Sequence, residues 1–131
     1  MAIVKTYKEL LVWQKGISLV SKIYKVTEDF PRRETYGLTD QIRRASVSIP
    51  SNIAEGFGRR SKAEMGRYIQ IALGSLYELE TQLILASNLN YMPINIFQEI
   101  VRQISELDAM LQSFSFNLRH PKIPNPKTNQ S

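Results

Sequence analysis

Hydrophobic residues recur in four long segments of the chain at alternating spacings of three and four residues. Such spacing places side chains on one face of an α-helix. It predicts helices over about residues 8–28, 36–57, 62–89 and 95–118. No segment of the sequence alternates apolar and polar residues for long enough to indicate a β-strand. Because the connections between the helices are mostly short, the pattern indicates an all-α fold, an antiparallel up-down four-helix bundle.

Each predicted helix has a main apolar stripe, which we expect to face the core. In the first helix the stripe consists of Leu10, Trp13, Ile17, Val20 and Tyr24. In the second helix it consists of Leu38, Ile42, Ala45, Ile49 and Ile53. In the third helix it consists of Met65, Ile69, Ala72, Leu76, Leu79, Leu83 and Ala86. In the fourth helix it consists of Phe97, Ile100, Ile104, Leu107, Leu111, Phe114 and Leu118.

Two of the predicted helices also carry apolar residues outside the main stripe. In the first helix these are Val12, Leu19, Ile23 and Val26. In the third helix they are Tyr68, Ile71, Leu73, Tyr77, Ile84 and Leu85. A helix that is apolar over most of its circumference buries more than one face, either at the centre of the bundle or in an interface between identical subunits. Gly74 and Ser75, inside the third helix, indicate the close approach of another helix or subunit.

The second predicted helix contains Pro50, which lacks a backbone N–H and crowds the carbonyl of Ser46. The helix is therefore expected to kink near residues 46–50 or to break, with Ser48 as the new N-cap. Glycines at positions 56 and 58 are expected to end the helix in the left-handed conformation. Ser61 and Glu64 form a capping box at the start of the third helix.

The 131 residues fit one domain, with the bundle over residues 1–118 and a proline-containing tail over residues 119–131 that is expected to be disordered. The sequence has no cysteine, so it can form no disulfide or thiolate metal site. It shows neither a signal peptide nor an apolar run long enough to span a membrane. These features predict a cytoplasmic protein that does not associate with membranes.

The sequence offers little for catalysis or metal binding. His120 is the single histidine and lies at the edge of the tail, and no Glu-x-x-His pair is present. Nucleophilic catalysis would therefore lack its usual base. We expect no catalytic residue, no metal site and no cofactor, and hence a protein that is not an enzyme.

Positive charge is concentrated in the middle of the chain, whose overall net charge is +5. The candidate nucleic-acid-binding residues are Arg32, Arg33, Arg43, Arg44, Arg59, Arg60, Lys62 and Arg67. Acidic residues outnumber basic ones over residues 68–118, so we expect the molecule to have a basic end and an acidic end. Arginine suits phosphate recognition because its planar fork donates hydrogen bonds in pairs.

Two interpretations of this basic cluster remain open. Asp40 precedes Arg43 and Arg44, Glu55 precedes Arg59, and Glu64 precedes Arg67 at spacings that allow ion pairs along a helix. The cluster would then be a solvated, ion-paired surface. Alternatively it binds a polyanion, with aromatic rings at Tyr36, Phe57 and Tyr68 available for stacking.

Two segments of the sequence carry a family resemblance: QIRRASVSIPSNIAEGFGR, from Gln41 to Arg59, and GSLYELET, from Gly74 to Thr81. Over about residues 7–118, the chain resembles the bacterial four-helix-bundle family named for proteins encoded in intervening sequences of 23S ribosomal RNA genes. The resemblance implies an up-down bundle that assembles into a ring-like pentamer with a basic surface. Relatives of the family include the accessory variability proteins of diversity-generating retroelements, which bind a reverse transcriptase and nucleic acid.

The residues and the resemblance together predict a non-enzymatic homo-oligomer that binds RNA or another nucleic acid through its basic surface. The alternative is an adaptor that docks a protein partner such as a retroelement reverse transcriptase. A third hypothesis, a small-molecule or catalytic role inside the bundle or at the centre of the ring, is supported by no group of residues. Steep salt dependence and weak sequence specificity are expected if phosphates are the ligands.

Overall fold

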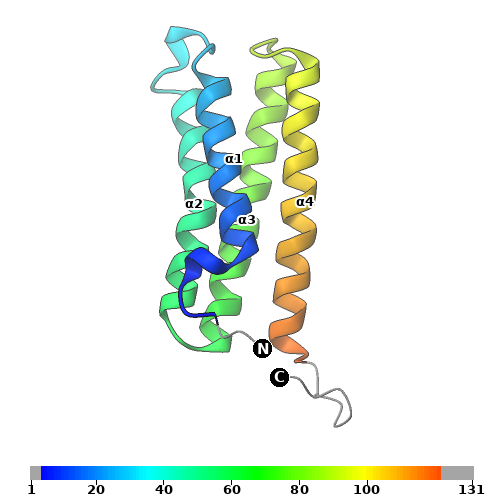
Figure 1. Cartoon of the computed structure of the whole chain (residues 1–131). Helices are drawn as coiled ribbons and strands as arrows, with labels where there is room; N and C mark the ends of the chain where they lie inside the picture. Colours follow the sequence, from blue (N-terminus) through cyan, green and yellow to red (C-terminus); the bar gives the residue numbers. More distant parts are fainter. Residues whose placement is uncertain (1–3, 122–131) are drawn as a thin grey trace.

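A computed structural model, which describes residues 4–121, consists of four long helices joined by short connections. The helices are α1 (Leu11–Thr27), α2 (Leu38–Gly58), α3 (Lys62–Asn88) and α4 (Ile94–Arg119), and two short 3₁₀ helices are η1 (Tyr7–Glu9) and η2 (Arg32–Glu34). The long helices run alternately up and down (Figure 1), and residues 4–121 contain no β-strand. The predicted four-helix bundle is therefore confirmed. Residues 8–10, predicted as the start of the first helix, belong instead to η1 and the connection after it.

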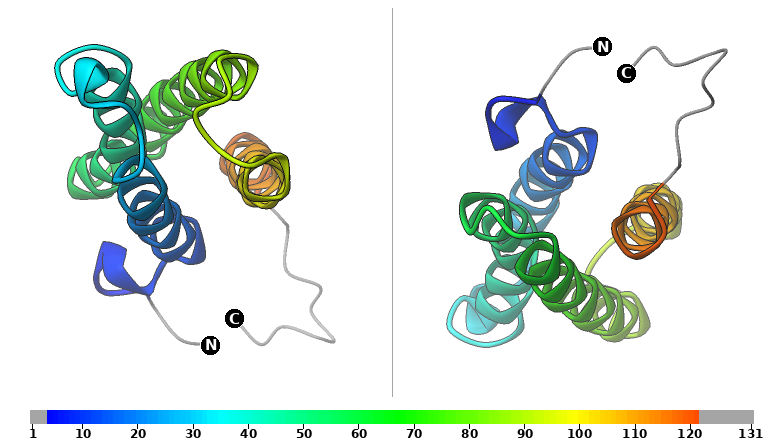
Figure 2. Two further views of the ribbon diagram at one scale, coloured as in Figure 1. Left: turned by 90° about the horizontal axis from the view of Figure 1, so that it is seen from above. Right: turned by 90° about the horizontal axis from the view of Figure 1, so that it is seen from below.

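Viewed along the bundle, α2 and α4 lie diagonally opposite each other, with α1 and α3 between them (Figure 2). Arg119, which was assigned to the tail, still belongs to α4. The rest of the predicted disordered tail, residues 122–131, lies outside the described residues.

The predicted stripes of three helices form the core. Every residue of the α3 stripe is buried, and Leu73 joins it from outside the stripe. The α2 and α4 stripes are also buried at their centres, while Leu38, Phe97, Phe114 and Leu118 are half-buried at their ends. Burial of these aliphatic side chains is the main source of stability for the bundle.

The orientation predicted for the first helix is wrong. Ile17 and Tyr24, from its predicted main stripe, are 40% and 41% exposed, whereas Leu19 and Ile23 are buried. A close approach between α1 and α2 explains this orientation. Gly16 packs against Pro50, and a Cβ atom at Gly16 would lie 3.4 Å from the Pro50 Cβ atom. Because the two stripes of α1 are similarly apolar, this contact between distant segments decides which stripe is buried.

Helix α2 continues through Pro50, so the predicted break with a new cap at Ser48 is wrong. Neighbouring polar side chains bond to the backbone around the proline. The Ser46 hydroxyl donates to the carbonyl of Arg43 over 2.8 Å, and the Asn52 amide donates to the carbonyl of Ser48 over 2.7 Å. The hydroxyls of Ser48 and Ser75 are also hydrogen-bonded, 2.8 Å apart, which links α2 to α3.

The glycines near the end of α2 do not have the predicted left-handed conformation. No glycine of the described chain has a positive φ, and Arg60 has one instead, at 60°. Gly56 is required for helix packing, because a Cβ atom there would lie 2.7 Å from the Tyr68 Cβ atom. The predicted capping box is half formed: the Ser61 hydroxyl accepts the Glu64 N–H over 3.2 Å, while the Glu64 carboxylate binds a guanidinium in the next turn.

Candidate nucleic-acid interface

The predicted basic residues lie at two opposite ends of the bundle. Arg32 and Arg33 in η2 lie near the start of α2, and Arg59 and Arg60 lie just beyond its end (Figure 1). A helix of 21 residues is about 30 Å long, so these two groups cannot form one compact surface. We call the end where α2 turns into α3 the basic end. Its cations are those of the α2–α3 turn and of the adjacent ends of α3 and α4: Arg59, Arg60, Lys62, Arg67 and Arg119.

The opposite end is not the acidic end that the sequence predicted. Arginines and acidic residues are mixed there: Arg32 and Arg33 lie near Glu28, Asp29 and Glu34. The acids of the C-terminal half instead lie along the sides of the bundle, where Glu99 and Glu106 form salt bridges with lysines of α1.

At this opposite end, Arg43 stabilises the C-terminus of α1. Its Nε atom donates to the Thr27 hydroxyl over 2.8 Å, and its Nη2 atom donates to the Tyr24 carbonyl over 3.3 Å. The guanidinium also lies 4.6 Å from the centre of the Tyr24 ring. A cation at a helix C-terminus interacts favourably with the helix dipole. Of the two predicted pairings with Asp40, the structure contains the one with Arg44, at 3.0 Å.

Glu34 connects two turns at the same end. Its carboxylate accepts the backbone N–H of Leu38 over 3.0 Å and the hydroxyl of Tyr91 over 2.7 Å. The backbone hydrogen bond is the main reason why the pKa of Glu34 lies below its ordinary value. The same carboxylate raises the pKa of Tyr91. Glu34 thus caps α2, whose N-cap, Gly37, has no side chain, and it joins the α1–α2 connection to the α3–α4 connection.

At the basic end, two arginines surround Tyr68. The Arg59 guanidinium donates to the Tyr68 hydroxyl over 2.9 Å and to the Glu55 carboxylate over 3.1 Å. The Arg67 guanidinium lies 4.6 Å from the centre of the Tyr68 ring and pairs with Glu64, which raises the pKa of Arg67. The predicted ion pairs of Arg59 and Arg67 are therefore confirmed. Exposed pairs of this kind are weak, so both guanidiniums can exchange their carboxylates for phosphates.

Arg60 and Lys62 differ from these arginines because neither forms a salt bridge within residues 4–121. Both side chains are exposed. Arg60 also occupies a left-handed backbone conformation, with φ at 60°, which glycine or asparagine adopts at lower cost. A long cationic side chain is thus held at a strained position on the exposed turn between α2 and α3.

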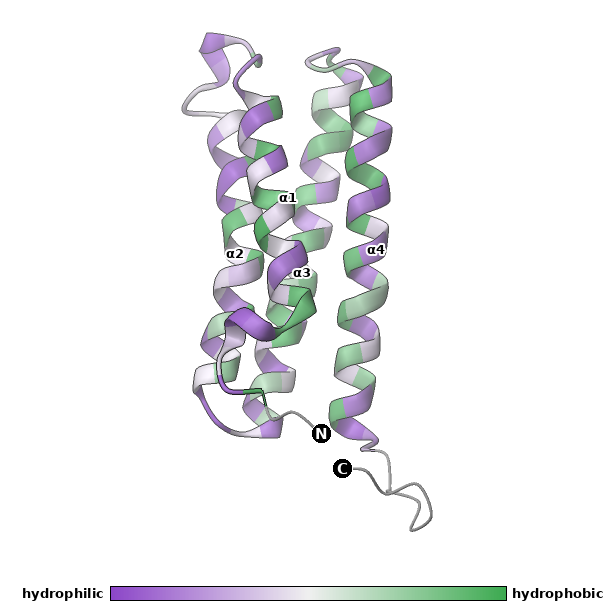
Figure 3. Cartoon of the chain, viewed as in Figure 1, coloured by the Kyte–Doolittle hydropathy of each residue, from purple (hydrophilic) through white to green (hydrophobic). Residues whose placement is uncertain are grey.

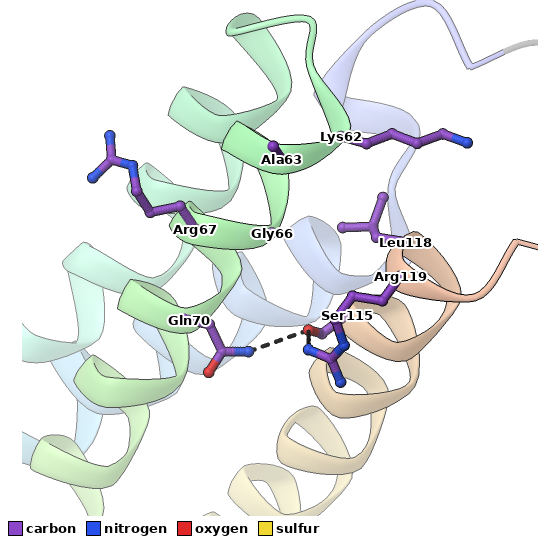
Figure 4. Close-up of a pocket in the computed structure, with 8 residues that line it drawn as sticks. All are labelled: Lys62, Ala63, Gly66, Arg67, Gln70, Ser115, Leu118 and Arg119. Atoms are coloured by element: carbon purple, nitrogen blue, oxygen red, sulfur yellow. Dashed lines mark hydrogen bonds between the residues drawn. The ribbon is translucent and has the colours of Figure 1, made fainter.

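Two adjoining clefts at the basic end are lined by both apolar and basic residues. The end cleft, of about 360 Å³, is lined by Val4, Leu10, Gly56, Phe57, Arg60, Ser61, Lys62, Met65, Phe114 and Leu118. The side cleft, of about 330 Å³, lies between the start of α3 and the end of α4, and is lined by Lys62, Ala63, Gly66, Arg67, Gln70, Ser115, Leu118 and Arg119 (Figure 4). Lys62 and Leu118 line both clefts, so the two adjoin.

The side cleft contains residues that the sequence analysis missed. The buried Ser115 hydroxyl accepts hydrogen bonds from Gln70, over 3.2 Å, and from Arg119, over 3.0 Å (Figure 4). Arg119 is thereby held beside the cleft, whereas the Arg67 side chain points away from α4. The antiparallel order of the helices could have revealed this pairing, since it places the end of the fourth helix beside the start of the third.

An apolar groove runs between α1 and α2, away from the core. It is lined by Tyr7, Trp13, Ile17, Val20, Val47, Pro50, Ser51 and Ala54 and has a volume of about 300 Å³. Trp13 is half-buried here and makes an edge-to-face contact with Tyr7, with 5.2 Å between ring centres. Hydrophobic residues recur along all four helices (Figure 3). The predicted second apolar surface therefore exists on α1, but it is formed by the stripe that was expected to face the core.

Two further sequence predictions concern α3. Ile71, Tyr77, Ile84 and Leu85 are all exposed, as a second apolar surface on this helix requires. Nothing in the described chain lies within 4 Å of a Cβ atom built at Gly74. Gly74 therefore does not serve the close approach of another helix of the described chain, and its proximity to a second subunit stays a prediction.

The described residues contain no group of acidic, histidine or cysteine side chains arranged to hold a metal ion. None of the helices within residues 4–121 is both long and apolar enough to cross a bilayer.

Four antiparallel helices with a cationic end define a small all-helical bundle protein. The chain belongs to the 23S rRNA-intervening sequence protein family, whose family model matches residues 8–113. This match confirms the resemblance that the α2 and α3 segments indicated.

One solved structure with a similar fold is a crystal structure, at 1.70 Å resolution, of a protein with unknown function from the S23 ribosomal protein family of Bacteroides thetaiotaomicron VPI-5482. The two chains superpose with a TM-score of 0.74 and are 23% identical, over 81% of this chain and 96% of the other. At this identity the likeness supports the fold alone. Comparison with curated proteins gives no significant match.

Proposed function

We propose that this chain is a non-enzymatic, oligomeric nucleic-acid-binding protein of the cytoplasm whose basic end binds the phosphates of RNA. The observation that carries the proposal is the presence of two exposed cations, Arg60 and Lys62, that form no salt bridge in the described chain. Arg60 is held there despite an unfavourable backbone conformation. Strained residues cluster at functional sites, and here the strained residue presents a guanidinium to solvent.

The neighbouring cations support the same ligand. Arg59, Arg67 and Arg119 lie around these two residues, so one end of the bundle has a local excess of positive charge. Binding to such a surface releases counterions from the nucleic acid, which makes affinity fall steeply with salt. Within residues 4–121 the basic end has no groove-reading element such as a helix protruding from the bundle, so recognition by this part of the chain depends on phosphates more than on sequence.

We further propose that the apolar groove between α1 and α2 is covered by a second copy of the chain. Ile17 and Val47 are each 40% exposed in the single chain, although both are aliphatic. Arg60, Lys62 and Arg119 are not among the residues that line the groove, so a second copy seated on it can leave these three cations free. Repetition of such a contact around an axis closes a ring, and the family resemblance implies five copies.

An adaptor role is the second candidate, with a protein such as a reverse transcriptase docked on the basic end. The ion-paired state of Arg59 and Arg67 favours this candidate, because carboxylates of a protein partner can replace Glu55 and Glu64. Affinity would then be retained after nuclease treatment of the partner.

The test is a fluorescence-anisotropy titration with labelled RNA hairpins and duplex DNA at low and physiological salt. The variant with both Arg60→Glu and Lys62→Glu should bind at least roughly tenfold more weakly than the wild type. The matched control carries Arg32→Glu and Arg102→Glu, which reverse two exposed charges elsewhere. At physiological salt the control should change affinity by less than about twofold, since its charges then lie more than a screening length of about 8 Å from the basic end.

Equal weakening by both variants would show that net charge, and not the basic end, determines binding. Absence of binding to every nucleic acid at low salt would contradict the proposal and favour the adaptor. Light scattering on the same samples tests assembly, because a 15.1 kDa species at micromolar concentration would contradict the oligomer.

A further inference from the structure

The end cleft combines an apolar interior with a cationic rim. Phe57 and Phe114 line it and are half-buried, and Met65 lines it as part of the core. Arg60 and Lys62 lie on its rim. Among the described residues that line it there is no aspartate or glutamate. The cleft therefore favours a ligand that is both flat and apolar in one part and negatively charged in another.

The neighbouring side cleft extends the positive charge beyond the rim. Lys62 lies between the two clefts, and Figure 4 shows its side chain extending past Leu118. Arg119 lies on the other side of Leu118 and is held in place by the Ser115 hydroxyl. Lys62 and Arg119 thus lie on either side of Leu118, which lines both clefts. A nucleotide strand has the complementary arrangement, with phosphates on both sides of each base.

We propose that the end cleft binds one unpaired base of an RNA strand, with the flanking phosphates bound by Arg60, Lys62 and Arg119. The proposal rests on the proposed function and narrows it from polyanions in general to single-stranded or bulged RNA. The cleft volume of about 360 Å³ is in the range that ligand pockets occupy. Bases in a duplex are paired and stacked, so they cannot enter the cleft, whereas a base in a loop or bulge can.

Electrostatic attraction alone predicts that the protein prefers a duplex to a single strand, whereas a base-binding cleft predicts the reverse. This difference makes the proposal testable. A duplex has a higher phosphate density than a single strand, so a purely electrostatic surface binds the duplex more tightly. Preference for a single strand requires a contribution from the base itself. Stacking of a base on an aromatic side chain provides such a contribution.

The experiment compares three RNAs of equal length: an oligouridine strand, an abasic strand with the same phosphates, and a blunt duplex. Affinities are measured by anisotropy at low salt with the full chain. The wild type should bind oligouridine roughly tenfold more tightly than the abasic strand. Phe114→Leu removes one aromatic wall and should abolish most of this preference while leaving the affinity for the abasic strand within about twofold. Lys62→Ala should lower the affinity for both strands by the same factor, and its control, Arg102→Ala, should lower neither affinity.

The outcomes separate this proposal from the proposed function. Equal affinity of the wild type for oligouridine and the abasic strand would overturn the base site and leave phosphate binding in place. An unchanged preference in folded Phe114→Leu protein would show that the base binds elsewhere. If Phe114→Leu protein does not fold, the affinities of the wild type for oligouridine and for the abasic strand still test whether a base is bound. Failure of all three RNAs to bind would overturn both proposals.

Discussion

A methyl group added at Gly56 should destabilise the bundle, although glycine is a poor helix former. In Gly56→Ala the new Cβ atom would lie 2.7 Å from the Tyr68 Cβ atom and 3.2 Å from the Met65 sulfur. The Tyr68 Cβ atom is attached directly to the α3 backbone, so it cannot rotate away. Helices α2 and α3 must separate by roughly 1 Å at this point to restore an ordinary contact.

The expected magnitude is the difference between two terms. Overpacking that shifts backbone costs about 3 kcal/mol, while alanine gains about 1 kcal/mol over glycine in helix propensity. The free energy of unfolding should therefore fall by about 2 kcal/mol. Since the unfolding entropy is about 2.1 cal/mol/K per residue, the midpoint temperature should fall by roughly 8 °C.

Gly66→Ala is the matched control. Nothing lies within 4 Å of a Cβ atom at Gly66, so only the helix propensity changes and the free energy of unfolding should rise by up to about 1 kcal/mol. Urea unfolding followed by circular dichroism, at one fixed protein concentration, measures both variants. If Gly56→Ala were as stable as the wild type, the close packing of α2 on α3 at this position would be refuted.

Three further changes test the turns. Arg60→Gly should raise the free energy of unfolding by roughly 0.5–1 kcal/mol, because glycine tolerates the left-handed conformation, and it should weaken RNA binding. A variant whose melting temperature and RNA affinity both rise, or both fall, would contradict this prediction. Ser61→Ala removes the N-cap of α3 and should cost about 1 kcal/mol in urea unfolding. Glu34→Gln should lower the melting temperature at neutral pH. Because the folded protein depresses the Glu34 pKa below 4.5, the contribution of Glu34 is present above that pH and is lost as the pH falls below it, so melting curves of wild type and variant should converge in acid.

Helical periodicity alone predicts most of this fold. The main stripes of α2, α3 and α4 are buried as expected, although α3 also carries exposed apolar residues outside its stripe. Helix α1 is different because its second stripe is about as apolar as its first, and periodicity cannot rank the two. The choice depends on the contact between Gly16 and Pro50, residues that are far apart in the sequence. The face of α1 that remains outside is available for assembly.

The candidate site is less predictable because a cation's role depends on its partners. Asp40, Glu55 and Glu64 could be assigned to arginines from spacing, but Arg43 instead binds the C-terminus of α1. The separation of Arg32 from Arg60, by contrast, follows from the length of α2 and could have been inferred from the predicted helix. Arg119 was missed since it is isolated in sequence and joins the basic end only through the antiparallel packing of α4.

The segment that identifies the family serves packing more than binding. Within it, Pro50 contacts Gly16, Ser48 bonds to Ser75, and Gly56 admits Tyr68. Each of these contacts positions α2 against a neighbouring helix, so membership of the family supports the fold of this chain and does not by itself identify a ligand. The proposed phosphate contacts depend instead on Arg60, Lys62 and Arg119, which lie beyond that segment, although Gly56 and Phe57 of the end cleft lie within it. We therefore expect charge changes at the basic end to abolish RNA binding without lowering the stability of the bundle. Loss of binding with unchanged stability would show that the basic end carries the function and that the family segment maintains the packing of the core.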